Sequence, residues 1–280
     1  MKSLTIIEPE ILIKGYLTKI DINGHSYFSS DLLRISDIYL STYTGYISFK
    51  ALRFLSSLEK YITVTNINNE HIYDLIPYRH NRDYSLRIKQ YKALEHKSEI
   101  AKKIIELKHK KYNELLTELN LKTIRINYHE NIFSKFYFNQ IRELFKSNGY
   151  EYKTRKGKMG FINVKADNPI NAVLNYYYGY TEHKLLREID IYGLDFSLPY
   201  LHSQRKGSLN LIYDVVELLR NRVDRLVIKL TENKVIKQSD FKALEGYLMI
   251  ANTRKYNNIY DKSISRSILS QAVEEFIQLL

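Results

Sequence analysis

The spacing of apolar residues changes near residue 80, and this change limits the folds that the chain can adopt. Before it, β-prone runs are short and occupy residues 3–7, 10–17, 18–28, 35–41, 61–66 and 71–77. Asn23-Gly24 divides the third run and predicts a hairpin turn, because both residues tolerate a positive φ. From residue 88, apolar residues recur at the three- and four-residue spacing of helices. We therefore predict an α+β fold, with a small β-rich domain over residues 1–80 and a larger all-α domain over residues 81–280.

Capping and stop signals define individual helices. Ser48 is a candidate N-cap for a short helix over residues 49–60, which lies within the β-rich part. Asn168 followed by Pro169 begins a long helix in the preferred way, and Gly149 ends the helix before it as a left-handed residue. Further helices are predicted over residues 88–120, 129–149, 208–220 and 264–280, with two more over residues 223–252, the second capped by Ser239.

The helix that starts at Asn168 contains an unusual set of residues. Its tyrosines, too many for one core face, are Tyr176, Tyr177, Tyr178 and Tyr180. We expect most of them to be structural and one or two hydroxyls to reach a phosphate or a catalytic neighbour. Gly179 costs helix stability, so we also expect it to allow a close packing contact.

The positive charge of the chain lies in its second part. The whole sequence has a net charge of +12. Residues 1–78 hold 7 Lys and Arg against 8 Asp and Glu, which leaves 36 against 23 for residues 79–280. A concentrated positive charge attracts a polyanion, and nucleic acid is the commonest polyanion in cytoplasm. The alternative to nucleic-acid binding is that the high Lys content serves only solubility or reflects the codon use of an AT-rich genome.

Several basic segments are candidates for contact with DNA phosphates. The helix over residues 88–120 has lysines on the surface outside its apolar stripe, namely Lys92, Lys97, Lys102, Lys103, Lys108, Lys110 and Lys111. Because phosphates present the same charge at every step, such a face can follow DNA without reading its sequence. The candidates in the predicted hinge and loops are Arg79, Arg82, Arg87, Lys153, Arg155, Lys156, Lys158, Arg205 and Lys206. A charged helix that is only solvated is the alternative interpretation.

Composition and missing motifs argue against several classes of protein. The chain has no Cys, so it has no disulfide and no thiolate-bound zinc, as expected in a reducing cytoplasm. Its start lacks the apolar region of a signal peptide, and no apolar run approaches the roughly 18 residues that span a bilayer. Without a P-loop, G-x-G-x-x-G or H-E-x-x-H motif, a nucleotide-driven motor, a dinucleotide enzyme and a zincin are disfavoured. We expect a soluble cytoplasmic protein.

A candidate metal site combines one histidine with two carboxylates. His202 precedes Asp214 and Glu217, which stand three residues apart. On a helix that begins near Ser208 the two carboxylates share one face, and the preceding loop can fold His202 back over them. Imidazole with carboxylates suits Mn²⁺ or Mg²⁺ rather than a metal selected by thiolates. A solvated helix face beside a loop histidine gives the same spacing, so spacing alone leaves both interpretations open.

The order of residues around His202 carries a resemblance to a known family. The run contains, in order, Gly193, Leu194, Asp195, Tyr200, Leu201, His202, Gly207, Ser208, Leu209, Asp214, Glu217 and Arg220. The helix upstream adds Asn168, Pro169, Ile170, Asn171, Leu174, Asn175, Tyr176 and Tyr178. In this combination the chain resembles the CRISPR-associated adaptation integrase, the first of the Cas proteins, over most of its length. Each piece alone is weak, and the specificity comes from the combination.

The resemblance implies a metal-dependent DNA endonuclease and integrase of CRISPR antiviral defence. It implies that Glu130, His202 and Glu217 bind Mn²⁺ or Mg²⁺, and that Asp214 holds His202 or a water beside them. Without the resemblance, Glu130 is only an acid favourable to the start of a helix. The implied reaction is attack by the 3′-hydroxyls of a short DNA fragment on phosphodiesters at the ends of a repeat, which inserts a spacer. The implied assembly is a homodimer through the β-rich domain, bound to the small second Cas protein.

Some positions depart from the family pattern. Phe196 and Pro199 replace the usual Pro and Gly, Tyr177 and Asn131 replace two glycines, and Leu218 replaces an acid. The implied metal ligands are kept, so the chemistry is retained while the metal preference and the specificity stay open. Two other functions are compatible with the sequence: a non-catalytic basic DNA-binding or scaffold protein, and a related integrase that inserts the ends of a mobile element.

Overall fold

A computed structural model describes residues 2–65, 71–76, 84–124, 129–152, 166–203, 210–244 and 247–280. The chain divides into two compact units, Met1–Arg82 and Asp83–Leu280. The first unit is β-rich and the second is mostly helical, which confirms the predicted fold class. The division falls between residues 82 and 83, whereas the sequence predicts it between residues 80 and 81. Among the described residues, no helix is long and apolar enough to cross a membrane.

The first unit contains two four-stranded sheets. One sheet has the strand order β1-β5-β7-β8, in which β8 runs antiparallel to β7 and the others are parallel; the strands are β1 (Lys2–Ile7), β5 (Ile35–Ser41), β7 (Tyr61–Thr65) and β8 (His71–Leu75). The other has the order β4-β3-β2-β6, and its strands are β2 (Glu10–Gly15), β3 (Lys19–Ile22), β4 (His25–Phe28) and β6 (Thr44–Ile47). Asn23 and Gly24 have φ values of 48° and 84°, so the predicted hairpin turn joins β3 to β4.

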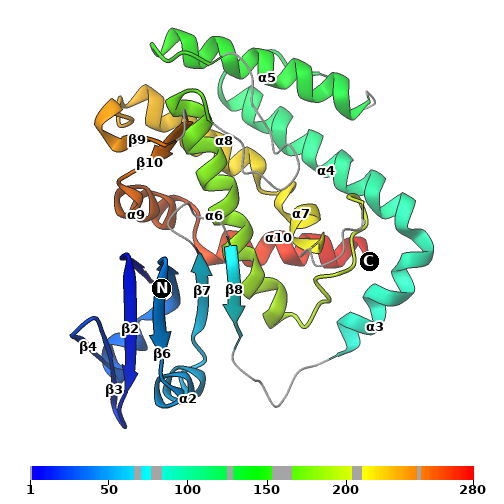
Figure 1. Ribbon diagram of the computed structural model, residues 1–280. Helices are drawn as coiled ribbons and strands as arrows, with labels where there is room; N and C mark the ends of the chain where they lie inside the picture. Colours follow the sequence, from blue (N-terminus) through cyan, green and yellow to red (C-terminus); the bar gives the residue numbers. More distant parts are fainter. Residues whose placement is uncertain are drawn as a thin grey trace. The chain divides into compact units, whose positions relative to one another are not determined.

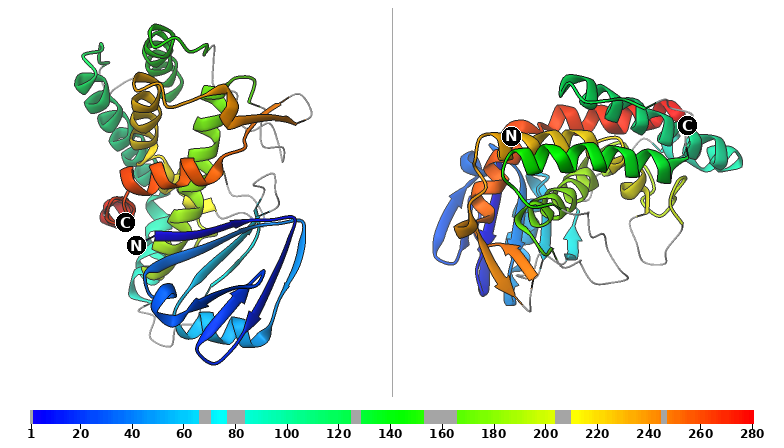
Figure 2. Two further views of the ribbon diagram at one scale, coloured as in Figure 1. Left: turned by 90° about the vertical axis from the view of Figure 1, so that its left-hand side faces the viewer. Right: turned by 90° about the horizontal axis from the view of Figure 1, so that it is seen from above.

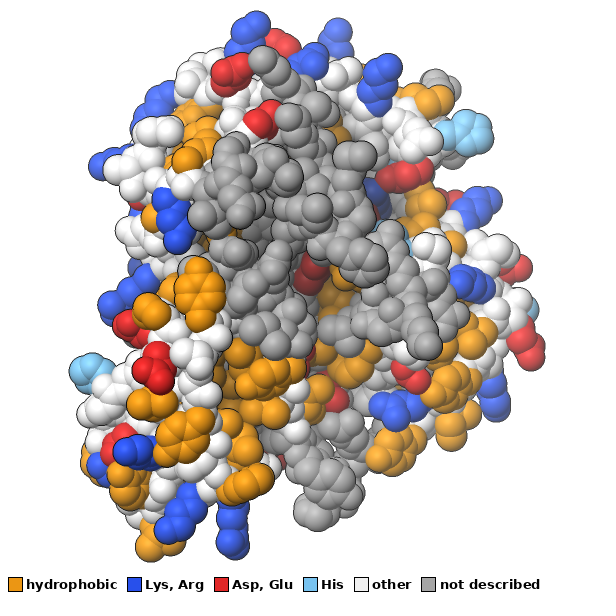
Figure 3. Space-filling model, viewed as in Figure 1, with side chains coloured by type: hydrophobic (Ala, Val, Ile, Leu, Met, Phe, Trp, Pro, Cys, Tyr) orange, Lys and Arg blue, Asp and Glu red, His pale blue; other side chains and the backbone are white. Residues whose placement is uncertain are grey.

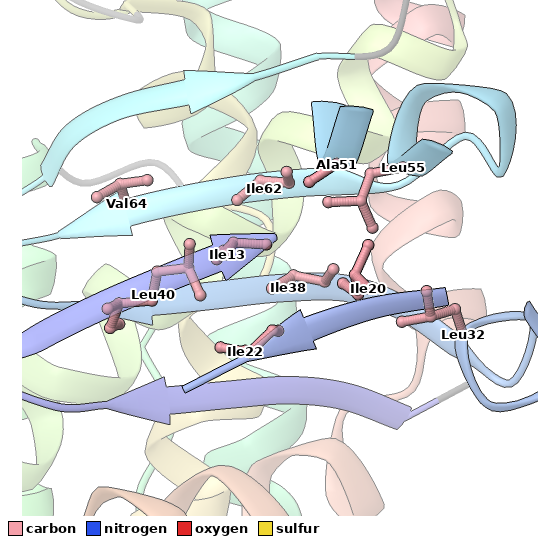
Figure 4. Packing of buried hydrophobic residues seen from close by; sticks show 11 residues of the cluster. Ile13, Ile20, Ile22, Leu32, Ile38, Leu40, Ala51, Leu55, Ile62 and Val64 are labelled. Atoms are coloured by element: carbon pink, nitrogen blue, oxygen red, sulfur yellow. The ribbon is translucent and has the colours of Figure 1, made fainter. Parts of the chain in front are cut away.

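The core of the first unit is formed by residues of both sheets and of two helices (Figure 4). Its apolar side chains are Ile11, Ile13, Ile20, Ile22, Leu32, Ile38, Leu40, Ala51, Leu55, Ile62 and Val64. Burying each Ile or Leu contributes about 1.5–3 kcal/mol to stability. Helix α2 (Phe49–Ser57) supplies Ala51 and Leu55, and Ser48 caps it by accepting the backbone N–H of Ala51, as predicted. A second, short helix, α1 (Ser29–Leu32), and strand β6 were not predicted.

The second unit is built mainly of helices (Figures 1 and 2). They are α3 (Ser85–Lys92), α4 (Lys97–Glu118), α5 (Glu130–Ser147), α6 (Pro169–Ile191), α7 (Asn210–Val216), α8 (Arg220–Glu232), α9 (Thr253–Ser263) and α10 (Arg266–Leu279). Helix α6 is buried on most of its surface and packs against α7, α8 and α10. A helix buried all round is a core element. Its start is the one predicted: Asn168 accepts the N–H of Asn171, and Pro169 stands at the first turn.

Three predicted helices differ from the structure. The helix over residues 88–120 is interrupted by a 3₁₀ turn at Ala93–His96. The helix over residues 208–220 ends at Val216. The second helix within residues 223–252 is wrong, because Phe241–Leu244 and Tyr247–Ile250 form the antiparallel strands β9 and β10. Strand β10 is fixed to a distant segment by the hydrogen bond from the Leu248 N–H to the Ala166 carbonyl, which measures 2.9 Å.

Two glycines were given predicted roles, Gly149 as a helix stop and Gly179 as a site of close packing, and only the first prediction is confirmed. Gly149 has a φ of 79° directly after the last turn of α5, so it ends that helix in the left-handed conformation, as predicted. A Cβ built on Gly179 would meet no atom of the described residues within 4 Å, apart from the neighbouring backbone of its own helix. The predicted close packing contact at Gly179 is therefore wrong.

Candidate active site

Helices α4 and α5 place Glu130 among three polar partners. Glu130 is the first residue of α5, and its carboxylate lies 2.5 Å from Lys108 Nζ, 2.8 Å from His109 Nε2 and 3.0 Å from Ser134 Oγ. Lys108 and His109 are neighbours on α4, and the His109 ring stacks on Phe133 at a centroid distance of 3.8 Å. Burial alone would raise the pKa of Glu130, but the His109 hydrogen bond and the Lys108 ammonium outweigh it and lower the pKa to about 2. Glu130 is therefore a carboxylate at neutral pH.

Asp214 holds the loop that contains His202. It lies on α7, is fully buried, and accepts the backbone N–H groups of Tyr200, Leu201 and His202 at 2.5, 3.1 and 3.0 Å. The same carboxylate lies 2.8 Å from His202 Nδ1. The Asp214 carboxylate accepts a hydrogen bond in each of these backbone contacts, so we assign the proton of the His202 ring to Nδ1. This leaves the Nε2 lone pair free to bind a cation.

Glu217 follows α7 in a tight turn. The prediction that Asp214 and Glu217 share one continuous helix is wrong, because α7 ends at Val216. The backbone then tightens to i→i−3 hydrogen bonds from Leu218 to Val215 and from Leu219 to Val216, at 3.0 and 2.9 Å. Both leucines are buried, so the turn is fixed by packing of their side chains. The turn still places Glu217 beside His202, with Oε1 at 3.9 Å from Nε2.

The Glu217 side chain is 5% exposed and is surrounded by cations. Its Oε1 accepts the Nε–H of Arg220 at 2.7 Å, and its Oε2 lies 2.7 Å from Lys108 Nζ. Burial would raise the pKa of Glu217, but the charges of Arg220 and Lys108 outweigh it and lower the pKa. Arg220 is itself held over the ring of Tyr178, at 4.8 Å from the centroid.

Lys108 therefore lies between two carboxylates that come from different elements. We call Lys108, Glu130, His202, Asp214 and Glu217 the central cluster. Lys108 was predicted to lie on the surface of its helix as a candidate phosphate contact, but its side chain is only 11% exposed. The sequence does contain a signal for its burial, because it continues the four-residue spacing of Ile100 and Ile104, which are both buried.

The central cluster contains side chains of the types that suit Mn²⁺ or Mg²⁺, namely carboxylates and an imidazole. Oxygens of Glu130 and Glu217 lie within 2.7 Å of one nitrogen, so one small cation can contact both. His202 Nε2 is beside them, and Asp214 orients its ring. Glu217 Oε2 is buried and accepts no hydrogen bond with acceptable angles from the described residues. With the ammonium of Lys108 between the carboxylates, no three His, Asp or Glu side chains of the described segments are placed to hold an ion.

The tyrosines of α6 support the site without entering it. The Tyr176 hydroxyl donates to Asn257 at 2.5 Å, and the Tyr177 hydroxyl donates to the Tyr256 carbonyl at 3.1 Å. The Tyr178 hydroxyl donates to the buried Asp224. These three hydroxyls are used inside the fold, so the expected contact of one or two with phosphate does not involve them. Tyr178 reaches the central cluster through its ring, which contacts Arg220.

Of the nine basic residues in the predicted hinge and loops that are candidates for contact with DNA, eight lie outside the described residues. These are Arg79, Arg82, Lys153, Arg155, Lys156, Lys158, Arg205 and Lys206. Arg87 is described, and its Nε donates to the Gly193 carbonyl at 3.0 Å, so it has a structural contact. On the face that Figure 3 shows, the coloured Lys and Arg side chains are scattered over the surface.

Comparison with protein families finds a match over almost the whole chain. The family model for CRISPR associated protein Cas1 matches residues 10–128 and 121–260. The CRISPR-associated endonuclease Cas1 1 of Pyrobaculum aerophilum is 40% identical over 68 residues, which are 24% of this chain and 22% of that protein. The protein of the same name from Thermodesulfovibrio yellowstonii is 31% identical over 103 residues, 35% of this chain and 32% of that protein. These alignments thus span a third or less of the relatives' length.

Solved structures share the fold over the full chain. A Cas1 protein from Thermotoga maritima has a TM-score of 0.85 at 17% identity and covers 100% of this chain and 96% of its own. A casposase bound to integration product has a TM-score of 0.79 at 21% identity, with 100% and 90% covered. A Cas1 in a complex with DNA has a TM-score of 0.63 at 15% identity, with 99% and 91% covered. A Cas6-RT-Cas1–Cas2 complex has a TM-score of 0.67 at 14% identity, with 99% and 34% covered.

Proposed function

The chain belongs to the Cas1 family of CRISPR-associated proteins, and on this premise we propose that it is a metal-dependent DNA integrase and endonuclease of CRISPR adaptation. One observation carries the proposal: oxygens of Glu130 and Glu217 approach a single nitrogen to 2.5 and 2.7 Å, although the two residues are far apart in the chain. His202, oriented by Asp214, lies at the edge of this pair. Carboxylates and an imidazole in this arrangement are suited to Mn²⁺ or Mg²⁺ and to phosphate chemistry.

The proposed reaction transfers a DNA strand. The 3′-hydroxyl oxygen of a short fragment forms a bond to a phosphorus of the repeat and loses its proton, while the bond from that phosphorus to the 3′ oxygen of the repeat strand breaks and that oxygen gains a proton. With water in place of the hydroxyl, the outcome is hydrolysis. The bound metal supplies a Lewis acid for the phosphate and lowers the pKa of the attacking hydroxyl.

Four residues of the central cluster, and Arg220 beside it, have proposed tasks in this reaction. Glu130, His202 and Glu217 bind the metal. Asp214 keeps Nδ1 of His202 protonated and Nε2 directed at the site. Arg220 fixes Glu217 through its 2.7 Å contact, so that Glu217 keeps one position while DNA enters and leaves.

The proposed partners follow from the relatives. Solved relatives include a Cas1 with DNA and a Cas1 in a complex with Cas2. We therefore propose that this protein binds DNA fragments and a repeat array, that it forms a homodimer through residues 1–80, and that it assembles with the small second Cas protein. The loop residues Lys153, Arg155, Lys156, Lys158, Arg205 and Lys206, with Arg79, Arg82 and Arg87, are proposed phosphate contacts.

Strand transfer by purified variants tests the proposed function. Glu130→Gln, His202→Ala and Glu217→Gln should each lower strand transfer on a branched DNA substrate by more than about 100-fold, which exceeds the 10–100-fold cost of losing an outer partner of a metal ligand. DNA binding should stay within a few-fold of wild type. EDTA should abolish the activity, and Mn²⁺ or Mg²⁺ should restore it.

Glu275→Gln is the matched control for these carboxylate substitutions. Glu275 forms an ion pair with Lys111, which lies on the same helix as Lys108. Neither Glu275 nor Lys111 belongs to the central cluster. Its substitution should leave strand transfer unchanged. Full activity of the Glu217→Gln protein, or activity in EDTA, would remove the assignment and leave a non-catalytic DNA-binding protein.

A second candidate function is integration of a mobile element. The casposase has a TM-score of 0.79 over the whole chain, which favours this candidate alongside the first. The chemistry is the same, so only the substrate separates them. Insertion of short fragments at a CRISPR repeat supports adaptation, and insertion of one element's own ends at a target without repeats supports the alternative.

A further inference from the structure

Lys108 is the only described lysine that lies between two carboxylates of the central cluster. Its ammonium contacts Glu130 at 2.5 Å and Glu217 at 2.7 Å, and its side chain is 11% exposed. Glu217 is more deeply buried, at 5% exposed. Leaving two such carboxylates close together without a cation is unfavourable, because like charges repel and burial penalises the charged form. Lys108 supplies that cation from within the chain.

We propose that Lys108 is a resident counter-ion that holds Glu130 and Glu217 when no divalent ion is bound, and that it must leave them before a metal ion can bind there. This inference rests on the metal dependence contained in the proposed function. It adds a residue that restricts access to the metal site, acting on the carboxylates rather than on the DNA.

The Lys108 ammonium and a divalent metal ion cannot occupy the space between Glu130 and Glu217 at the same time. Mg²⁺ binds carboxylate oxygens at about 2.0–2.1 Å and needs several further ligands around it. The same Glu130 and Glu217 oxygens are already within 2.5 and 2.7 Å of Nζ, so a metal ion that reached both would overlap the ammonium. Even at about 4 Å, an ammonium and a divalent ion repel each other strongly at a partly buried site.

The side chain of Lys108 is suited to leaving. A lysine has a flexible four-carbon stem and a compact charge, whereas an arginine presents a rigid fork that grips carboxylates in two places. Arg220, the other cation on Glu217, uses its Nε and packs on the Tyr178 ring, so it has a fixed position. Release of Lys108 therefore clears the side of Glu217 that faces Glu130, while Arg220 keeps the opposite oxygen in place.

Metal affinity of a Lys108 variant tests the inference. Isothermal titration of the purified full chain with Mn²⁺ at neutral pH should give at least about tenfold tighter binding for Lys108→Met than for wild type, since the metal no longer displaces a charge-assisted hydrogen bond. Lys111→Met is the matched control: it removes a lysine of the same helix that pairs with Glu275, and its Mn²⁺ affinity should equal that of wild type.

Two further variants keep the test valid if Lys108→Met folds poorly. Lys108→Gln removes the charge but can still donate hydrogen bonds, and it should also bind Mn²⁺ more tightly than wild type. Lys108→Arg keeps the charge and should bind no more tightly than wild type. Thermal unfolding gives a second measurement, because Mn²⁺ should raise the melting temperature of Lys108→Gln by more than that of wild type.

The outcomes separate this inference from the proposed function. Wild-type binding of Mn²⁺ as tight as that of both uncharged variants would overturn the role of Lys108 and leave the metal site intact. Failure of wild type, Lys108→Met and Lys108→Gln alike to bind Mn²⁺ or Mg²⁺ would overturn the proposed metal chemistry, and the inference with it.

Discussion

At the scale of single residues, the central cluster is a balance of buried and half-buried charged groups. Glu130 and Glu217 are stabilised as carboxylates by different cations: Lys108 contacts both, and Arg220 contacts Glu217 alone. His109 adds a hydrogen bond to Glu130 from a fully buried ring. Removing Lys108 or Arg220 leaves the buried Glu217 carboxylate with too little compensation, which is costly.

The pH dependence of stability follows from Glu130. Burial opposes its ionisation, but His109 and Lys108 lower its pKa from the ordinary 4.5 to about 2. Since the folded pKa is depressed, the contribution of Glu130 to stability is fully present above about pH 5 and is lost as the pH falls from 4.5 toward 2. Urea unfolding should therefore show a larger difference between wild type and Glu130→Gln at pH 7 than at pH 3. A difference that is equal at both pH values would contradict this.

At the scale of elements, two glycines should respond in opposite ways to substitution by alanine. A Cβ on Gly15 of β2 would lie 2.1 Å from the Ala51 nitrogen of α2, so Gly15→Ala should cost about 1–3 kcal/mol through overpacking. Gly179 is inside α6, and beyond the backbone of its own helix no described atom lies within 4 Å of its Cβ position, so Gly179→Ala should stabilise by about 0.5–1 kcal/mol. Chemical denaturation of the full chain measures both, and a loss of stability in Gly179→Ala would contradict the structure around α6.

Elements that local signals define were predicted correctly from the sequence. The caps at Ser48 and Asn168, the Asn23-Gly24 turn and the stop at Gly149 each depend on a few neighbouring residues. The β9–β10 hairpin was missed, because its edge is fixed by a hydrogen bond to Ala166, which is far away in the sequence. A helical interpretation of residues 241–250 considered only local propensity, which tertiary contacts override.

In the candidate site, too, some features could be predicted from the sequence and others depend on contacts between distant residues. Residue types and spacing indicated His202, Asp214 and Glu217, and the resemblance to a family added Glu130. The structure brings these four together. Lys108 was assigned to the helix surface as a candidate phosphate contact, since lysine is rarely buried unless it is paired. Its partners come from α5 and from the turn after α7, and no local pattern in α4 can show them.

At the scale of the whole molecule, the chemistry is concentrated in the second unit. Every member of the central cluster lies within Asp83–Leu280, on α4, on α5, and in the segment around α7. The net charge of +12 also comes from this part of the sequence, which suits a unit that binds DNA. The β-rich unit has a core of its own, so its proposed role in dimer formation is separable from catalysis.

The central claim is that Glu130, His202 and Glu217 bind one metal ion between them. Anomalous diffraction at the manganese edge from crystals grown with Mn²⁺ tests it most directly. The account predicts one peak within about 2.0–2.3 Å of a Glu130 oxygen, a Glu217 oxygen and His202 Nε2, with Lys108 Nζ moved away from both carboxylates. No peak at saturating Mn²⁺ with Lys108 still between the carboxylates, or a peak bound by other residues, would contradict it.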